Sequence, residues 1–295
     1  EANYRAMKKE LAAAREIADG GIVGFNIMVA TQRYEEYVKI AVEAGADVII
    51  SGAGLPVDLP KYTEGSSVKI APIVSSVKSL NVLIRMWERK YNRYPDFVVI
   101  EGPSAGGHLG FSLEELETFT QEPYDQVIRG IIGKTREYAK KAGREIPVVV
   151  AGGIFDGEDM KHALSLGADG VQVATRFVTT EECDAAPAYK EAYIKAKKED
   201  ICIVKSPVGM PGRAIHNAFI DKTQKEKCRI KHCYHCITTC DPAKIPYCIT
   251  QALVNAAEGK LDQALLFCGE NAYRCDKIEK VKNIMEEFDR ANQER

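Results

Sequence analysis

Short apolar runs alternate with longer amphipathic stretches along most of the chain. The apolar runs are rich in valine and isoleucine, which favours strands of a parallel sheet that is covered on both faces. Six runs predict such strands, at residues 22–28, 48–51, 70–74, 97–100, 148–151 and 171–174. The intervening stretches predict helices at residues 31–43, 77–90, 124–142 and 156–166. This order predicts repeated βα units.

The number of strands leaves two α/β folds open. A doubly wound open sheet accommodates six strands, whereas a closed βα barrel needs eight. The chain opens on a polar helix at residues 3–19, so a barrel would need two further strands before that helix. Beyond residue 180 the pattern changes to a charged helix at 188–200, a rigid turn at 207–213, and amphipathic helices at 247–258 and 276–290. We expect this tail to form a helical cap.

Composition excludes some classes of partner. Of the 295 residues, 45% are hydrophobic, which supports a packed core. The formal net charge of −2 argues against nucleic acid or an anionic membrane as the main partner. There is no apolar run of membrane-spanning length and no signal peptide. The nine cysteines do not form an evenly spaced disulfide framework, so we expect a cytoplasmic protein with reduced thiols or a metal site.

A lone histidine, His108, lies in a glycine-rich turn after the fourth predicted strand. Histidine accepts protons near neutral pH, so His108 is a candidate general base or hydrogen-bond donor to a substrate. A structural histidine that binds a loop carbonyl is the alternative. Gly106 and Gly107, directly before it, would let a ligand approach the backbone. Asn26 is a polar residue inside the first apolar strand, and a buried amide there needs a ligand or a neighbouring backbone as partner.

Glycines and polar residues also follow the last two predicted strands. Phosphate sites recur at this end of βα barrels, where loop N–H groups and a short helix N-terminus converge. We therefore predict a phosphate site there, with two ordinary βα turns as the alternative. Its candidate residues are Gly152, Gly153, Gln172, Ala174 and Thr175.

Four cysteines lie close together in the tail: Cys228, Cys233, Cys236 and Cys240. Thiolates at such spacing can bind zinc or an iron–sulfur cluster, which predicts a metal site. Free, partly buried thiols are the alternative, because spacing alone does not establish a four-ligand geometry.

Three motifs resemble the nitronate monooxygenase family, formerly called 2-nitropropane dioxygenases. They are EGPSAGGHLG at 101–110, AGGI at 151–154 and GVQVATRF at 170–177, and the flavin-dependent enoyl-acyl-carrier-protein reductases share them. The resemblance implies an α/β fold, a TIM (β/α)8 barrel that binds FMN. Residues 1–180 would form a partial FMN-binding barrel, and residues 181–295 the barrel closure and a helical, cysteine-rich cap. The family begins with two strands that this chain lacks, so we expect the first two strands to be missing and the flavin site to be incomplete.

The resemblance also implies roles for the candidate residues. His108 would take the α-proton of the substrate, as in nitronate monooxygenases, or lie beside flavin and nicotinamide, as in the reductases. Asn26, Gly106 and Gly107 would contact the flavin. The residues that would hold the FMN phosphate are Gly152, Gly153, Gln172, Ala174 and Thr175. The cysteine cluster is not a general feature of the family.

Together these features predict an FMN-dependent monooxygenase, a flavoprotein that turns alkyl nitronates into carbonyl compounds and nitrite with His108 as base. The alternative is an NAD(P)H-dependent reductase of enoyl thioesters or quinones, in which Arg213 of the cap would grip a cofactor phosphate. A third hypothesis is a flavin-binding or metal-sensing module whose cysteines switch with redox state. Each predicts a small-molecule ligand, and the apolar C-terminal helices offer a surface for a homodimer.

Overall fold

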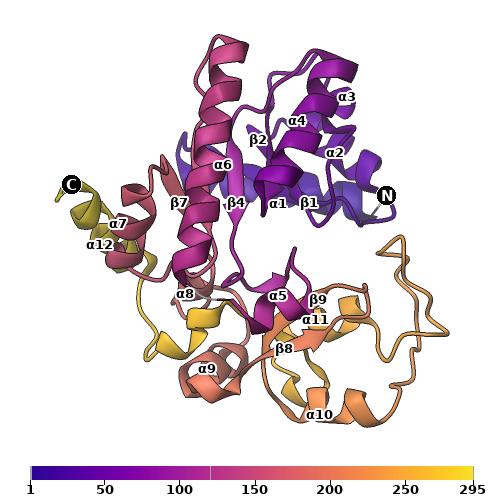
Figure 1. Ribbon diagram of the computed structural model, residues 1–295. Helices are drawn as coiled ribbons and strands as arrows, with labels where there is room; N and C mark the ends of the chain where they lie inside the picture. The colour runs from indigo at the N-terminus through magenta and orange to yellow at the C-terminus, as the bar shows by residue number, and fades with distance from the viewer. Residues whose placement is uncertain (1, 120, 295) are drawn as a thin grey trace. The chain divides into compact units, whose positions relative to one another are not determined.

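The computed structural model describes residues 2–119 and 121–294, drawn as a ribbon in Figure 1. The chain divides into two compact units. The first comprises Glu1–Ile100 and Asp125–Val149, and the second Glu101–Tyr124 and Val150–Arg295. The units do not follow the expected boundary at residue 180, which stays a prediction.

All six expected strands form, and they make one parallel sheet in the order β1-β2-β3-β4-β6-β7. The strands are β1 (Gly24–Met28), β2 (Val48–Gly52), β3 (Lys69–Val74), β4 (Val98–Glu101), β6 (Val148–Ala151) and β7 (Gly170–Gln172). Gly24 lies opposite Val48, and Ile73 opposite Val99. Each new strand is added beside the previous one in a single direction. A doubly wound sheet would reverse its order at a switch point, so the topology is that of a TIM barrel.

Helices cover one face of the first three strands. They are α1 (Ala2–Ala18), α2 (Tyr34–Glu43), α3 (Leu59–Tyr62) and α4 (Val77–Tyr91), and α6 (Gln121–Ala142) follows further along the chain. Buried side chains from both layers, among them Ile49, Ile70 and Leu83, form one apolar cluster. Helix α4 begins at Ser76, whose hydroxyl accepts a hydrogen bond from the Ser79 N–H, and ends at Asn92 in a left-handed conformation.

The opposite face of β1 and β2 is only partly covered, which corrects the expectation of a sheet buried on both sides. Alternate residues of a strand point to opposite faces. On one side of β1, Gly24 and Asn26 are exposed and Met28 is half-buried, whereas Ile27 on the other side is buried. In β2, Val48 and Ile50 are half-buried, whereas Ile49 is buried.

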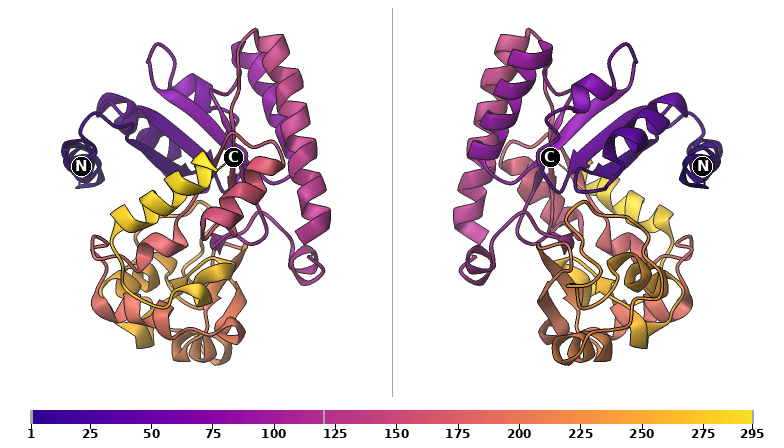
Figure 2. Two further views of the ribbon diagram at one scale, coloured as in Figure 1. Left: turned by 90° about the vertical axis from the view of Figure 1, so that its left-hand side faces the viewer. Right: turned by 90° about the vertical axis from the view of Figure 1, so that its right-hand side faces the viewer.

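The second unit contains helices and a small antiparallel sheet. The helices are α5 (Leu113–Glu117), α7 (Gly157–Ser165), α8 (Thr175–Val178), α9 (Pro187–Lys195), α10 (Ala218–Lys225), α11 (Ile249–Ala257) and α12 (Val281–Gln293), with short 3-10 turns η1 (Lys198–Asp200), η2 (Leu261–Gln263) and η3 (Glu270–Arg274). Helix α12 lies along α7, as Figure 2 shows, and Phe288 and Ile284 pack there against Met160 and Leu164.

An antiparallel sheet accompanies the helices of the expected cap. Its strands are β5 (Gly107–His108), β8 (Ile201–Lys205), β9 (Pro211–Ile215) and β10 (Leu266–Phe267). Strand β9 is central, because β8 pairs with one edge while β5 and β10 pair with the other. The rigid turn expected at 207–213 is thus a hairpin turn followed by β9. Strands β5 and β10, with two residues each, have too little periodicity to be read from sequence.

Salt bridges of the buried Arg176 connect α8 to α12 and to the segment just before it. Its Nη2 lies 2.7 Å from Glu287 Oε2 and its Nε 3.0 Å from Glu279 Oε1. Among the described helices, none is both long and apolar enough to span a membrane.

We expect Trp87→Phe to destabilise the first unit. Trp87 on α4 is fully buried, and its Nε1 donates a hydrogen bond to the backbone oxygen of Pro56 at 3.0 Å. The variant loses this hydrogen bond, whose net contribution to stability is about 0.5–1.5 kcal/mol, while the Pro56 oxygen keeps the Leu59 N–H as a donor at 3.2 Å. Urea unfolding followed by circular dichroism measures the loss, since the variant has no tryptophan left.

Val82→Ala on the same helix is the matched control, because Val82 is 41% exposed. It should change the free energy of unfolding by no more than about 0.5 kcal/mol. Equal losses in the two variants would mean that the Trp87–Pro56 hydrogen bond has no particular importance.

Candidate functional site

The candidate base, His108, lies on β5, which pairs with β9 within the second unit. His108 lies opposite Gly212 in this ladder. Its Nε2 is 2.7 Å from the hydroxyl oxygen of Ser206, and its ring meets the Phe267 ring edge-on with centroids 5.0 Å apart. Burial lowers the pKa of His108 from its ordinary 6.5. The imidazole is therefore neutral at neutral pH, which a proton acceptor requires.

Arg213 anchors the loop that leads to His108. It is 7% exposed, and its Nη1 donates hydrogen bonds to the backbone oxygens of Pro103 and Ala105 at 2.5 and 2.6 Å. Burial lowers its pKa. A guanidinium bound in this way to its own chain is not a free cation, so the expectation that Arg213 grips a cofactor phosphate is wrong.

Close contacts within the chain explain why positions 106 and 152 are glycine. A Cβ on Gly106 would lie 2.5 Å from the backbone carbon of Cys268, and one on Gly152 would lie 2.9 Å from the backbone nitrogen of Ala105. Gly152 also has a φ of +91°, which L side chains rarely adopt. The folded chain therefore requires glycine at both positions, whatever ligand binds there.

The structure brings the predicted phosphate residues together at the ends of β6 and β7. The backbone N–H groups of Gly152 and Gly153 make no hydrogen bond within the described part of the chain, nor does the half-buried amide of Gln172. Thr175 Oγ1 accepts a hydrogen bond from the Gly269 N–H at 3.0 Å. Ala174 is exposed beside it. Free N–H groups at glycines with positive φ are donors that a phosphate can use.

Asn271 is a neighbour of this site that sequence reasoning missed. Its Nδ2 donates to the backbone oxygen of Gly153 at 2.6 Å, so it orients the glycine pair. It comes from η3, 118 residues further along the chain. No local pattern could connect the two.

Asn26 differs from its expected environment. It is exposed on β1 and makes no side-chain hydrogen bond within residues 2–119 and 121–294. Of the two partners left open for Asn26, a neighbouring backbone is therefore not found among these residues. A ligand contact for Asn26, which belongs to the first unit, stays a prediction.

Glu101 is a second titratable group at a strand end. It closes β4, its backbone oxygen accepts a hydrogen bond from Tyr124 Oη at 3.1 Å, and its carboxyl group makes no hydrogen bond or ion pair in the part of the chain that the structure describes. Burial raises the pKa of Glu101 to about 7. Sequence reasoning did not single it out, because burial at this position depends on tertiary packing.

The predicted metal ligands do not form a ready site. Within the described residues, no three His, Cys, Asp or Glu side chains are arranged to hold a metal ion. Burial raises the pKa of the Cys240 thiol, and the neighbouring thiols of Cys236, Cys233 and Cys248 add to this effect. Cys248, which was not among the predicted ligands, thus also lies near these thiols. Metal binding stays a prediction that would require these thiols to move together.

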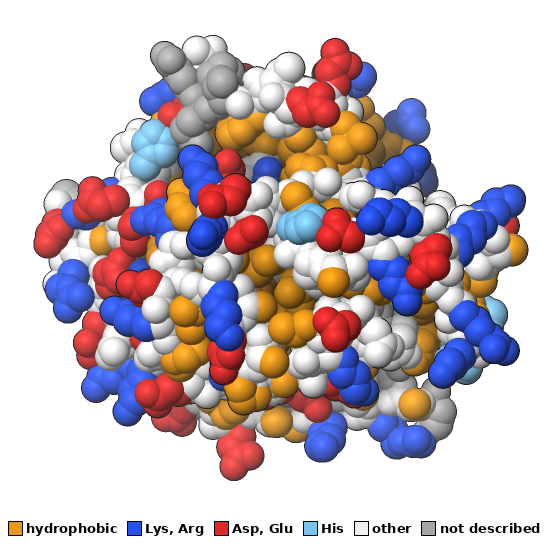
Figure 3. All heavy atoms as spheres, turned by 90° about the horizontal axis from the view of Figure 1, so that it is seen from below, with side chains coloured by type: hydrophobic (Ala, Val, Ile, Leu, Met, Phe, Trp, Pro, Cys, Tyr) orange, Lys and Arg blue, Asp and Glu red, His pale blue; other side chains and the backbone are white. Residues whose placement is uncertain are grey.

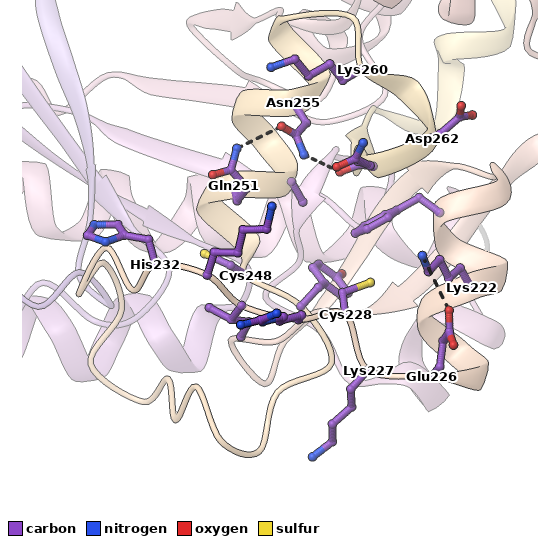
Figure 4. A pocket seen from close by; sticks show the side chains of 17 residues that line it. Lys222, Glu226, Lys227, Cys228, His232, Cys248, Gln251, Asn255, Lys260 and Asp262 are labelled. Atoms are coloured by element: carbon purple, nitrogen blue, oxygen red, sulfur yellow. Dashed lines mark hydrogen bonds and ion pairs between the residues drawn. The ribbon is translucent and has the colours of Figure 1, made fainter.

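Cys228 and Cys248 instead line a pocket of about 640 Å³ next to α11, shown in Figure 4. Its amide groups bind one another: Gln251 Nε2 donates to Asn255 Oδ1 at 3.0 Å, and Asn255 Nδ2 donates to the Gln263 backbone oxygen at 2.9 Å. Elsewhere on the surface, the face in Figure 3 carries acidic and basic side chains interspersed, without the single basic stripe of a nucleic-acid site.

The strand order of the parallel sheet defines an α/β protein of the TIM-barrel class. The chain belongs to the nitronate monooxygenase family, whose model, described as nitronate monooxygenase, matches residues 1–289. The resemblance stated from the sequence motifs is therefore confirmed.

Two staphylococcal proteins are similar in sequence. A probable nitronate monooxygenase of Staphylococcus saprophyticus is 29% identical over 198 residues, which is 66% of this chain and 51% of the relative. One of Staphylococcus aureus strain Newman is 32% identical over 127 residues, 43% of this chain and 33% of the relative. The chain thus spans about half of the first relative and a third of the second.

Two solved structures are similar in fold. FabK from Thermotoga maritima is 27% identical with a TM-score of 0.75, over 99% of this chain and 82% of that one. A nitroalkane oxidase from Streptomyces ansochromogenes is 17% identical with a TM-score of 0.63, over 100% of this chain and 78% of that one. The second likeness concerns the fold alone.

We expect Glu101→Gln to stabilise the protein at alkaline pH. With a folded pKa raised from 4.5 to about 7, the neutral carboxyl stabilises the fold below pH 4.5, and this contribution is lost as pH rises through 7. One pKa unit corresponds to about 1.4 kcal/mol, so the gain at pH 8 is about 3 kcal/mol. Urea unfolding at pH 5 and pH 8 measures it.

The exposed carboxyl of Glu117 on α5 provides the control. Glu117→Gln should leave the difference between the two pH values unchanged. The quantity to compare is the stability difference between the wild type and Glu101→Gln. If this difference is the same at pH 8 as at pH 5, ionising Glu101 does not destabilise the fold.

Proposed function

We propose that the protein is an FMN-dependent oxidoreductase that oxidises alkyl nitronates to carbonyl compounds and nitrite, with His108 as its general base. The main observation behind this proposal is the half-buried His108 imidazole, whose Nε2 lies 2.7 Å from the Ser206 hydroxyl oxygen and whose pKa is lowered by burial. The family membership supports the reaction class. The substrate is a small molecule, and the homodimer and the cytoplasmic location remain predictions.

The strand ends of the second unit fit an FMN phosphate. Gly152 and Gly153 would present their free N–H groups, and the Gln172 amide and the Thr175 hydroxyl would donate beside them. Ala174, Gly106 and Gly107 would line the approach, and Asn26 would contact the flavin. When bound, FMN supplies the redox chemistry that converts a nitronate and molecular oxygen into a carbonyl compound and nitrite.

The residues of the chain itself handle the proton. In one tautomer of His108, Nε2–H donates to Ser206 Oγ and Nδ1 carries no proton. The α-proton of a neutral nitroalkane passes to Nδ1, and the substrate leaves this step as a nitronate anion. Ser206 positions the ring, and Arg213 positions the loop through Pro103 and Ala105. A substrate that arrives as a nitronate does not need this step.

A second candidate is an NAD(P)H-dependent flavin reductase of enoyl thioesters or quinones. The TM-score is 0.75 for FabK and 0.63 for the nitroalkane oxidase, which supports the reductase as a second candidate. Rapid bleaching of bound flavin by NADH without oxygen would support the reductase. Flavin that is reduced by a nitronate but not by NADH would support the monooxygenase.

The cysteines suggest an additional cofactor under either function. We propose Cys228, Cys233, Cys236 and Cys240 as ligands of zinc or an iron–sulfur cluster, with Cys248 as a further thiol nearby. Metal analysis of protein purified without oxygen tests this, and protein without stoichiometric iron or zinc would rule it out.

His108→Asn should slow oxidation of neutral nitroethane about 10²- to 10⁴-fold, the usual contribution of a general base. Oxidation of the preformed ethyl nitronate should fall much less, because its α-proton is already gone. Steady-state oxygen consumption with each substrate measures both rates. Equal losses on the two substrates would refute the base role.

The wild-type pH profile provides an independent readout. Because burial lowers the pKa of His108, kcat/KM for the neutral nitroalkane should fall on the acid side only below about pH 6.5. Ser206→Ala, which removes the hydrogen bond to the ring, should shift this acid limb. An unchanged limb in Ser206→Ala would mean that the serine does not act through His108.

Gln172→Leu should weaken FMN binding about tenfold or more, because a hydrogen bond to a charged group is worth about 1.5–3 kcal/mol. The free amide of Gln172 has no role within the described residues, so the fold should persist. Fluorescence titration of flavin-free protein with FMN measures the dissociation constant. Gln224→Leu, at an exposed position on α10, is the control, and equal affinity in both variants would remove Gln172 from the site.

A further inference from the structure

The pocket of about 640 Å³ next to α11 has a lining with more positive than negative charge. Every residue that lines it falls within 219–263, so the pocket belongs to the second unit alone. Apart from two thiols, none of these residues has a part in the function proposed above. Its lining includes two carboxylates and five cationic side chains, those of Lys222, Lys227, Arg229, Lys231 and Lys260.

Three of the five cations already have partners within the protein. Lys222 Nζ lies 3.6 Å from Glu226 Oε1, an ion pair that Figure 4 shows at one side of the pocket. Lys227 Nζ donates a hydrogen bond to a backbone oxygen at 3.2 Å, and Lys260 is paired with Glu258. These three side chains are thus engaged before any ligand enters.

The other two cations, Arg229 and Lys231, have no counter-charge of their own. Neither makes a hydrogen bond or an ion pair in the part of the chain that the structure describes. The remaining carboxylate of the lining, that of Asp262, points away from Cys228 and Cys248 in Figure 4. A concave site with two unpaired cations attracts an anionic ligand.

Tyr247 adds a buried hydroxyl without a partner to the same lining. Tyr247 is 5% exposed, and its ring packs edge-on against Phe219 with centroids 5.0 Å apart. Its hydroxyl makes no hydrogen bond within the described residues, although none of their fully enclosed side-chain nitrogen or oxygen atoms lacks a partner. The hydroxyl is therefore not fully enclosed, and the pocket is the open space beside it. Because buried hydroxyls normally have a partner, an acceptor atom on a ligand would complete this one.

A backbone hydrogen bond brings the tyrosine next to the unpaired cations. The Cys228 N–H donates to the Pro246 backbone oxygen at 2.7 Å. Arg229 directly follows Cys228, and Tyr247 directly follows Pro246. Lys231 comes two residues after Arg229, a span of at most about 7 Å. One hydroxyl donor and two cationic donors are therefore gathered in one part of the pocket.

We propose that this pocket binds a small phosphate ester, whose phosphate accepts hydrogen bonds from Arg229, Lys231 and Tyr247. A guanidinium can bind two phosphate oxygens at once, and an ammonium and a phenolic hydroxyl are further donors. The rings of Phe219 and Tyr247 offer an apolar wall to the organic part of the ester. A volume of about 300–1,000 Å³ is usual for small-molecule pockets. This site goes beyond the proposed function, because it shares no residue with the proposed FMN phosphate site.

Calorimetric titration of the whole protein in excess FMN tests the site. The ligands are phenyl phosphate, benzoate and benzyl alcohol, which share a ring and differ in their charged group. Phenyl phosphate should bind most tightly, and raising KCl from about 50 to about 500 mM should weaken its binding because salt screens the cations. No binding of phenyl phosphate overturns the proposal. Benzoate or benzyl alcohol that binds as tightly as phenyl phosphate also overturns it.

Tyr247→Phe removes the hydroxyl and keeps the ring. Affinity for phenyl phosphate should fall about tenfold or more, the usual loss for a hydrogen bond to a charged group. Because this hydroxyl has no partner in the described chain, the variant should unfold at the same urea concentration as the wild type. A variant that loses stability but no affinity would show that the hydroxyl serves the fold, which overturns its role in binding.

Arg229→Gln and Lys231→Gln should each weaken binding by a similar factor. Lys225→Gln, at an exposed position on α10 that does not line the pocket, is the matched control and should bind as the wild type does. Unchanged affinity in Tyr247→Phe, or in both cation variants, overturns the proposal.

Gln172→Leu separates this site from the proposed FMN phosphate site. It should bind phenyl phosphate with unchanged affinity. Binding that is lost in Gln172→Leu but unchanged in Arg229→Gln would place the phosphate at the strand ends, which overturns the pocket and leaves the proposed function in place. Binding that is weakened in the pocket variants and kept in Gln172→Leu supports the pocket, even if no FMN binds and the proposed function fails.

Discussion

The candidate site depends on how one buried guanidinium is satisfied. Arg213 has little exposure and donates to the backbone oxygens of Pro103 and Ala105. A buried charge without such partners would cost several kcal/mol, so the loop must meet Arg213 at this place. Because Arg213 lies on β9 and the loop runs into β5, the same contact aligns the ladder that holds His108 opposite Gly212.

Because this loop is closely packed, its glycines can serve both packing and ligand binding. Gly106 admits the backbone of Cys268, and Gly152 admits that of Ala105. The motif that resembles a ligand site is therefore also a packing motif. The two roles are distinguished by the hydrogen-bond donors that packing does not use. The N–H groups of Gly152 and Gly153 and the Gln172 amide have no partner within the described chain. Those groups, and not the glycines as such, support a phosphate.

The parallel sheet could be predicted because each strand carries its own signal. Runs such as Val48–Gly52 and Val148–Ala151 each begin with three consecutive valine or isoleucine residues, which local propensity reveals. Strands β5 and β10 have two residues each and exist only through pairing with β9. Pairing of that kind depends on residues far away in the sequence, so the expected helical cap missed the small sheet.

The sequence by itself determined the βα order, the glycine turns at the strand ends and the candidate base, because these follow from residue type and neighbouring spacing. The tertiary structure alone decided which groups surround them. The Ser206 partner of His108 lies 98 residues away, and the Asn271 partner of Gly153 lies 118 residues away. Exposure was likewise decided by packing, which leaves Asn26 uncovered and encloses Glu101. Burial and partners depend on contacts between distant segments, and no local pattern encodes them.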